Sequence, residues 1–184
     1  MASQIDVRRL DSGDVEAIAR LMEQCQHRLY RYLLRLVLQP SVAEDLFQQT
    51  WLRIMERIHH YDPQRGFEGW LFAVAHNLAI DHLRRRQPKS LDEPAFSEAT
   101  RFSLARSADP GALDQLLSQE KADWIMEAVE NLPVVLREVI ALRFEEEMKL
   151  EEIAEALTLP AGTVKTRLRR ALIALRQSLR KKPN

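Results

Sequence analysis

LEEIAEALTLPAGTVKTRLRRALIALR, which spans Leu150 to Arg176, has the pattern of two short helices joined by a tight turn. In its first half, apolar residues recur at the i, i+3, i+4 and i+7 positions of one helix face: Leu150, Ile153, Ala154 and Leu157. Pro160 and Gly162 then interrupt the helical pattern, as turn residues do. A second amphipathic helix is expected to begin near Thr163, whose side chain is a suitable N-cap. This arrangement predicts a helix-turn-helix.

The second of these helices and the chain beyond it are strongly basic. No acidic residue occurs between Thr163 and Asn184, and the basic residues there are Lys165, Arg167, Arg169, Arg170, Arg176, Arg180, Lys181 and Lys182. A helix that enters the major groove needs polar side chains for base edges and flanking cations for phosphates. A solvated basic surface helix is the simpler explanation of a charge run alone. The helix-turn-helix spacing directly in front of it favours DNA binding.

The composition is that of a helical protein with material for one large domain or two small ones. The chain has 184 residues, of which 46% are hydrophobic and five are glycine. Its formal net charge is zero, but acidic residues gather between Glu145 and Glu155 and basic ones after Thr163, which leaves a local cationic patch. The single cysteine, Cys25, excludes an intrachain disulfide and a multi-cysteine zinc site. No apolar run suits a membrane span or a signal peptide, so we expect a cytoplasmic protein without membrane insertion.

Helical periodicity continues through the rest of the chain with one interruption. In the first half, amphipathic helices are predicted within Gln4 to Val37, from Val42 to Ile58 and from Phe67 to Arg86. Residues Gln87 to Gln119 contain three prolines and several serines, which predict a tether without a core of its own. Beyond it, Pro133 is expected to start a helix that buries Phe144. The sequence therefore predicts an all-α protein of two small helical domains, residues 1–88 and 120–184, joined by a flexible linker over residues 89–119.

Aromatic and amide side chains precede a cationic run in the helix from Phe67 to Arg86. The residues in question are Trp70, His76 and Asn77, followed by Arg84, Arg85 and Arg86. A cation at a helix C-terminus interacts favourably with the helix dipole, which is a sufficient structural reason for one of the arginines. Three in succession favour nucleic acid, because bases stack on aromatic rings while cations neutralise phosphates.

No catalytic or metal-binding motif is present in the sequence. His76, Asp81 and His82 are spaced i, i+5 and i+6, which spreads them around a helix instead of directing them at one ion. A Gly-rich phosphate loop, GxSxG, HExxH and CxxC are all absent. We therefore expect no enzymatic activity, no metal and no cofactor.

Taken in order, these segments resemble the extracytoplasmic-function sigma factors, the minimal members of the bacterial sigma-70 family. The residues that carry the resemblance are LYRYLLRLV (Leu29 to Val37), AEDLFQQTWLRI (Ala43 to Ile54), FEGWLFAVAHNLAIDHLRRR (Phe67 to Arg86), LPVVLREVIALRF (Leu132 to Phe144) and EEIAEALTLPAGTVKTRLRRA (Glu151 to Ala171). They cover both predicted domains and omit only the ends and the tether. The resemblance implies that residues 1–88 are sigma region 2 and residues 120–184 are sigma region 4.

The resemblance also implies partners and sites. The partners are core RNA polymerase, through its β′ clamp and β flap, promoter DNA and an anti-sigma factor. The residues implied in clamp binding are Asp45, Gln48, Gln49, Trp51 and Arg53, although Trp51 is expected in the core more than at the interface. The residues implied in −10 recognition and melting are Asp62, Arg65, Phe67, Trp70, His76, Asn77, Arg84, Arg85 and Arg86. The residues implied in −35 binding are Thr163, Lys165, Thr166, Arg167, Arg169 and Arg170.

Three residues depart from the family's pattern. Gln49 replaces a common acidic residue, so the clamp contact loses a charge. His76 stands where many relatives have arginine, so promoter melting is expected to be mildly sensitive to pH. Thr158 occupies a turn position usually held by glycine, where a β-branched residue at positive φ costs on the order of 1–2 kcal/mol. Either this turn takes another conformation, or region 4 is less stable than usual.

Two other classes of protein are compatible with the residues alone. A LuxR-like regulator would join a sensor domain to a helix-turn-helix that binds DNA by itself. An adaptor would use its helices for protein contacts only. Trp70, Asn77 and Arg84 to Arg86 favour the sigma factor over the regulator, because a sensor domain needs no second nucleic-acid face.

Overall fold

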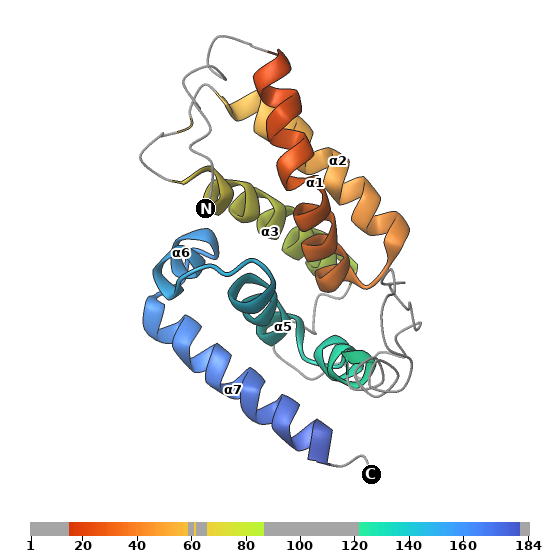
Figure 1. Ribbon diagram of the computed structural model, residues 1–184, viewed down its shortest axis with the longest axis vertical. Helices are drawn as coiled ribbons and strands as arrows, with labels where there is room; N and C mark the ends of the chain where they lie inside the picture. The colour runs from red at the N-terminus through yellow and green to blue at the C-terminus, as the bar shows by residue number, and fades with distance from the viewer. Residues whose placement is uncertain (1–14, 59–60, 62–65, 87–121, 181–184) are drawn as a thin grey trace, which may run out of the picture.

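All regular secondary structure in the described part of the chain is helical. The computed structural model describes residues 15–58, 61, 66–86 and 122–180 (Figure 1). In chain order the elements are α1 (Val15–Val37), α2 (Pro40–Arg57), α3 (Phe67–Arg86), a helix over residues 122–130, α5 (Val134–Ile140), η3 (Ala141–Glu145), α6 (Leu150–Ala156) and α7 (Ala161–Arg180). The predicted all-α fold class is confirmed. The predicted linker, residues 89–119, lies outside the described residues.

Helices α1, α2 and α3 pack around a shared apolar core. Each of them contacts the other two. Their largest fully buried side chains are Leu21, Leu29, Tyr32, Leu33, Leu36, Leu71 and Phe72. Pro40 is the first residue of α2, where a missing N–H costs no hydrogen bond. The chain turns between α1 and α2 at Leu38, which has a left-handed φ of 56° and donates its N–H to the Leu34 carbonyl at 2.8 Å.

The helix expected from Pro133 to Phe144 changes its geometry part-way along. It is α-helical from Val134 to Ile140 and continues as the π-helical segment η3. The Glu146 N–H accordingly donates to the Ala141 carbonyl, five residues back, at 3.1 Å. The prediction that Phe144 is buried is wrong, because the wider turn changes which side chains face inward, and Phe144 is 58% exposed.

The turn between α6 and α7 is closed by a Schellman motif. The N–H of Leu159 donates to the Ala154 carbonyl at 2.9 Å, and the N–H of Thr158 donates to the Glu155 carbonyl at 3.1 Å. Thr158 is the left-handed residue of this motif, with a φ of 54°. Of the two alternatives left open by the sequence, the chain therefore adopts the conformation that places a β-branched residue at positive φ.

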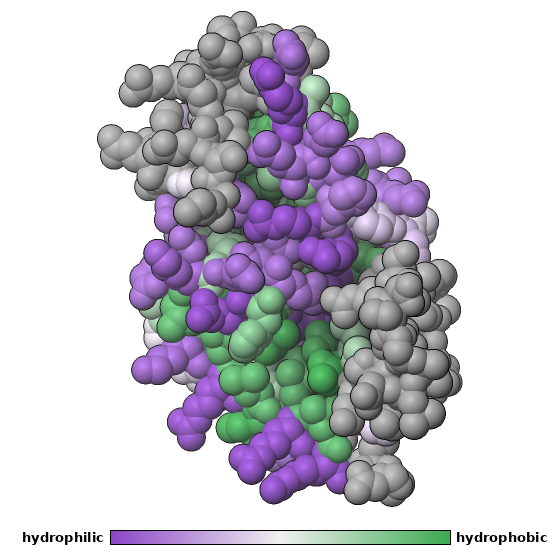
Figure 2. All heavy atoms as spheres, viewed as in Figure 1, coloured by the Kyte–Doolittle hydropathy of each residue, from purple (hydrophilic) through white to green (hydrophobic). Residues whose placement is uncertain are grey.

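The N-terminal helices and the C-terminal helices pack against each other. α3 contacts α6, and α1 contacts α5 and η3 (Figure 1). Buried apolar side chains from both halves form one continuous hydrophobic cluster. On the face shown in Figure 2, hydrophilic side chains dominate over the N-terminal helices and apolar ones gather over the C-terminal helices. The sequence pattern predicted two helical units and did not predict this contact between them.

Candidate nucleic-acid and polymerase interfaces

Helix α7 presents a polar, cationic face to solvent and an apolar face to the core. It begins at Ala161, so the prediction that Thr163 is its N-cap is wrong: Thr163 lies in the first turn and is partly buried. The inward face is formed by Val164, Leu168 and Ala171, all buried. The outward face carries Lys165, Thr166, Arg169 and Arg170, all exposed. The helical period thus brings these predicted DNA contacts onto one surface.

Arg167 lies in a different environment from the other predicted contacts on α7. Its Nη1 donates to Oε1 of Glu138 at 2.7 Å, and the Arg167 side chain is 25% exposed while that of Glu138 is 1% exposed. A buried carboxylate is costly unless it is paired. In this structure Arg167 therefore holds α7 against α5 through Glu138 and does not face outward with Lys165, Thr166, Arg169 and Arg170. Its predicted contact with DNA stays a prediction.

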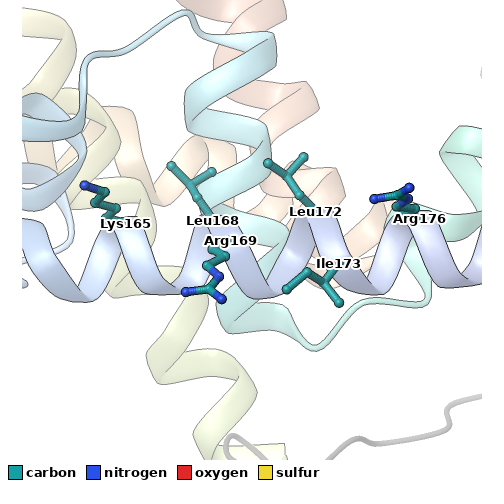
Figure 3. Close-up of a pocket in the computed structure, with 6 residues that line it drawn as sticks. All are labelled: Lys165, Leu168, Arg169, Leu172, Ile173 and Arg176. Atoms are coloured by element: carbon teal, nitrogen blue, oxygen red, sulfur yellow. The ribbon is translucent and has the colours of Figure 1, made fainter.

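A groove runs along α7 beside its cationic face (Figure 3). It has a volume of about 430 Å³ and is lined by Lys165, Leu168, Arg169, Leu172, Ile173 and Arg176. Leu172 and Ile173 are 49% and 46% exposed. Leu168 and Leu172 point to one side of the helix in Figure 3, and Arg169 and Ile173 point to the other. Exposed aliphatic side chains flanked by cations are typical of a surface that binds a macromolecule.

Trp70 belongs to a cluster of aromatic rings at the start of α3. Its ring centroid lies 4.9 Å from that of Tyr61 and 5.9 Å from that of Phe67. Trp70 and Tyr61 are partly exposed, whereas Phe67 is buried, so Phe67 supports the cluster from the core side. The predicted contact of Phe67 with DNA stays a prediction. Tyr61 was not predicted as a site residue. Its position in the loop ahead of α3 is the signal that could have identified it.

The other predicted contacts of α3 differ in exposure. Four are exposed: Asn77, Arg84, Arg85 and Arg86. His76 is turned towards α5, where its Nδ1 lies 3.1 Å from Oε2 of Glu138 and its side chain is 13% exposed. In this arrangement His76 is mostly buried, and its predicted contact with DNA stays a prediction. Asp62 and Arg65 lie outside the described residues.

Helix α2 exposes the polar residues predicted to bind polymerase. These are Asp45, Gln48, Gln49 and Arg53. Trp51 is only 3% exposed and packs edge-on against Phe47, with ring centroids 6.3 Å apart, so its expected position in the core is confirmed. Its predicted contact with polymerase stays a prediction. Leu52 and Met55, which were not predicted, are 56% and 41% exposed. Leu52 lies four residues after Gln48 and three after Gln49, and therefore shares their helix face.

Charged side chains are buried where the N-terminal and C-terminal helices meet. Arg28 of α1 donates from Nε to Oε2 of Glu146 at 2.6 Å, and from Nη1 and Nη2 to the Glu68 carboxylate at 2.7 and 3.0 Å. Its guanidinium also lies 5.9 Å from the centroid of the Phe72 ring. Burial raises the pKa of Glu146, whose side chain is 1% exposed, and the neighbouring Arg28 opposes that rise. Arg28 therefore joins α1 and α3 to the segment that precedes α6.

Two further arginines make contacts across the same boundary. Arg35 of α1 donates from Nε to Oε1 of Glu145 at 2.9 Å, and its Nη1 lies 3.5 Å from Oε1 of Glu130. Arg137 of α5 donates from Nη2 to the Leu36 carbonyl, in the last turn of α1, at 3.0 Å. Burial lowers the pKa of Arg137 to about 10. An arginine inside an otherwise apolar stretch is the sequence signal for a buried, paired charge. LLRLV, which contains Arg35, and VVLREVI, which contains Arg137, both have this pattern.

Within residues 15–58, 61, 66–86 and 122–180, no group of three or more His, Cys, Asp or Glu side chains could hold a metal ion. In that part of the chain, no helix combines the length and the apolar character that crossing a membrane requires.

Comparison with known families assigns both halves of the molecule. Residues 21–89 match the family model for Sigma-70 region 2, and residues 122–175 match the model for Sigma-70, region 4. Over 178 residues the chain is 35% identical to the ECF RNA polymerase sigma factor SigW of Bacillus subtilis, with 95% of each protein covered. The chain belongs to the extracytoplasmic-function (ECF) sigma factors. This sigma factor is also 30% identical over 181 residues to the ECF RNA polymerase sigma-E factor of Escherichia coli, covering 95% of this chain and 93% of that protein.

Two solved structures have the same fold. The structure of CnrH in complex with the cytosolic domain of CnrY matches with a TM-score of 0.70 and 21% identity, covering 100% of both chains. The sigma factor RpoE in complex with the anti-sigma factor NepR from Bartonella quintana matches with a TM-score of 0.71 and 22% identity, covering 92% of this chain and 100% of that chain. Helices α1 to α3 therefore belong to region 2, and the helices from residue 122 onward belong to region 4.

Proposed function

We propose that this sigma factor binds core RNA polymerase and directs it to promoters that carry −35 and −10 elements. The observation that carries the proposal is the presence of both sigma regions in one chain, each with an exposed surface suited to its task. Region 4 exposes a cationic recognition helix, and region 2 exposes an aromatic pair and a polar helix face. The protein would supply promoter choice to polymerase, without a catalytic step of its own, in the cytoplasm where polymerase acts.

Recognition of the −35 element is assigned to the outward face of α7. Lys165 and Thr166 lie near the N-terminus of this helix, the end that contacts base edges in helix-turn-helix proteins. Arg169 and Arg170 follow one turn later, where their guanidinium groups can pair with phosphates or bind guanine. All four side chains are exposed, so the DNA can reach them without any rearrangement of region 4.

Recognition and melting of the −10 element are assigned to the exposed residues of α3 and the aromatic pair before it. Trp70 and Tyr61 offer partly exposed rings on which an unpaired base can stack. Asn77 has donors and acceptors for a base edge. The exposed Arg84 to Arg86 run lies at the far end of the same helix, where it would neutralise the backbone of the separated strand.

Binding to the polymerase clamp is assigned to one face of α2. Asp45, Gln48, Gln49 and Leu52 fall at i, i+3, i+4 and i+7, and all four are exposed. Gln49 can form hydrogen bonds but lacks the charge of the acidic residue common in the family. Leu52 adds apolar area to this face, which favours association with a protein partner.

Control by an anti-sigma factor is proposed on two grounds. A solved sigma factor of this fold, RpoE, is bound to the anti-sigma factor NepR, and CnrH, which shares the fold, is bound to the cytosolic domain of CnrY. Region 4 of this chain also exposes large apolar side chains that need a protein partner to cover them: Ile125, Phe144, Leu172, Ile173 and Leu179. The β flap of polymerase and an anti-sigma factor would compete for such a surface.

A pair of substitutions tests the division of labour between the regions. Arg169→Ala should reduce transcription that depends on the −35 element and leave binding to core polymerase unchanged. Asp45→Ala should weaken core binding and leave the affinity of region 4 for −35 DNA unchanged. Arg180→Ala and Glu23→Ala, exposed residues of α7 and α1 outside both surfaces, are matched controls. Equal loss of core binding in the Arg169 and Asp45 variants would contradict the assignment.

A further inference from the structure

Thr166 differs chemically from the cations that surround it on the outward face of α7. Its exposed side chain lies in the second turn of the helix, directly after Lys165 and one turn before Arg169 and Arg170. Residues near the N-terminus of a recognition helix are the ones that meet base edges in the major groove. Thr166 is therefore placed to contact a base, and its chemistry decides which base it favours.

The hydroxyl of Thr166 is already bound within the helix. Its Oγ1 donates to the Gly162 carbonyl, one turn back, at 2.8 Å. A hydroxyl has a single hydrogen to donate, so this bond uses it. The bond also turns Oγ1 towards the backbone of its own helix and holds the side chain in one rotamer. The γ-methyl is therefore the group that this exposed side chain offers to a base.

The neighbouring cations need hydrogen-bond acceptors on the DNA. Lysine and arginine side chains donate hydrogen bonds and accept none, which applies to Lys165, Arg169 and Arg170 alike. In the major groove, cytosine presents a donor and adenine presents a donor beside an acceptor, whereas guanine presents two acceptors and thymine presents one acceptor and a methyl group. A surface that combines donors with an outward methyl group matches the edge of thymine best.

We propose that Thr166 selects a thymine in the −35 element: its γ-methyl packs on the C5-methyl group of that base, while its hydroxyl stays bound to the Gly162 carbonyl. The inference deepens the promoter-directed function proposed above and rests on it. The bond to Gly162 fixes the rotamer before DNA arrives, so binding does not have to order the side chain. Thr166 thus supplies specificity, and the cations around it supply most of the affinity.

The size of the contact follows from the area of one methyl group. Burying one group of this size changes an affinity by about fourfold. Uracil is thymine without its C5-methyl group, so uracil in the DNA removes the contact from one side. Thr166→Ser removes it from the other side and keeps the hydroxyl that binds Gly162. Because both changes delete the same contact, their effects on affinity should not add.

The DNA side is tested with the holoenzyme formed by the full-length chain and core polymerase. The probe is a promoter duplex identified by transcription from sheared genomic DNA. Further duplexes carry uracil in place of each thymine of the −35 element in turn, on either strand. Wild-type holoenzyme should bind about fourfold more weakly when one particular thymine is replaced.

The protein side is tested on the same duplexes. Thr166→Ser should bind the unmodified promoter about fourfold more weakly than wild type, and should lose nothing more when that thymine becomes uracil. Thr166→Val replaces the hydroxyl with a second methyl group and keeps the γ-methyl. It should therefore still bind the thymine duplex more tightly than the uracil duplex.

Two matched controls separate this contact from general effects on binding. Thr158→Ser removes one methyl group from an exposed threonine in the turn before α7, and should discriminate thymine from uracil as wild type does. Uracil at a thymine in the spacer between the two elements should leave the wild-type affinity unchanged. Circular dichroism of each variant should match that of wild type, which shows that the helices are intact.

Several results would overturn the inference while the promoter-directed function stands. These are a −35 element without an A·T pair, equal wild-type affinity for thymine and uracil at every −35 position, and wild-type discrimination by Thr166→Ser. Loss of discrimination in Thr166→Val would also overturn it, and would assign the contact to the hydroxyl. A holoenzyme that selects no promoter at all would refute the function itself, and this inference with it.

Discussion

Replacing Thr158 with glycine is expected to stabilise the protein, because Thr158 is the left-handed residue of the turn between α6 and α7. Its φ is 54°, and a residue with a Cβ pays on the order of 1–2 kcal/mol for this conformation. Glycine avoids that strain but loses more unfolded-chain entropy on folding, by about 0.4–1 kcal/mol. Thr158 is exposed, and both hydrogen bonds of the turn are made by backbone groups, so neither packing nor hydrogen bonding is lost. The net gain is about 0.5–1 kcal/mol.

This gain can be measured by thermal unfolding followed by circular dichroism at 222 nm. The two regions share one hydrophobic cluster, so we treat the protein as one cooperative unit, for which 1 kcal/mol shifts Tm by about 2–4 °C at this size. Thr158→Gly should then raise Tm by about 2 °C. Thr158→Ala keeps a Cβ at the same φ and should change Tm little. Thr158→Asn should fall between them, because asparagine tolerates the left-handed region better than other residues.

An unchanged or lower Tm for Thr158→Gly would refute the strain argument. Stabilisation by Thr158→Ala equal to that by Thr158→Gly would also refute it, because the gain would then come from the loss of β-branching and not from relief at positive φ. Glu147→Gly provides an independent test, since Glu147 is exposed and has a φ of 58°.

Three further predictions concern stability, pH and DNA affinity. Glu138→Ala removes a carboxylate that is 1% exposed and leaves Arg167 without its partner, so the free energy of unfolding in urea should fall by about 3 kcal/mol. Glu138→Gln should lower the free energy of unfolding by less. Negligible losses in both variants would contradict the buried pairing. Burial raises the pKa of the Cys25 thiol to about 11, so Ellman's reagent at pH 8 should react slowly until the protein unfolds. Because folding favours the protonated thiol, Cys25 contributes to the stability of the fold at pH values below its unfolded pKa of about 9. This contribution is lost as the pH rises towards 11, and the stability of Cys25→Ala should therefore depend less on pH in that range. Arg170→Ala should lower the slope of log K against log salt for −35 DNA by about 0.9 if Arg170 contacts a phosphate, while an unchanged slope and affinity would remove it from the interface.

Local periodicity was enough to predict the helices and the outward face of α7. The i, i+4, i+7 spacing of Val164, Leu168 and Ala171 determines which side of α7 is buried, and the exposure of Lys165 and Arg169 follows from it. The start of α7 was predicted near Thr163, whose side chain is a suitable N-cap, but the helix begins two residues earlier, at Ala161. The structure places the start after Pro160, whose carbonyl accepts the Thr163 N–H at 2.8 Å.

Contacts between distant segments were beyond the reach of the sequence pattern. Arg28 and Glu146 are 118 residues apart, and nothing in their immediate neighbours specifies that they pair. The same limit explains why the pairing of Arg167 and His76 with Glu138 was not predicted: they belong to cationic and aromatic stretches but face this buried carboxylate. The π-helical turn at η3, which exposes Phe144, also has no periodic signature in the sequence.

The most direct test of the sigma assignment is a transcription assay with purified core RNA polymerase on sheared genomic DNA, with and without this protein. The assignment predicts discrete new transcripts whose start sites share one −35 and −10 pair, present only when the protein is added. No new transcripts, together with failure to co-migrate with core polymerase on a sizing column, would contradict it.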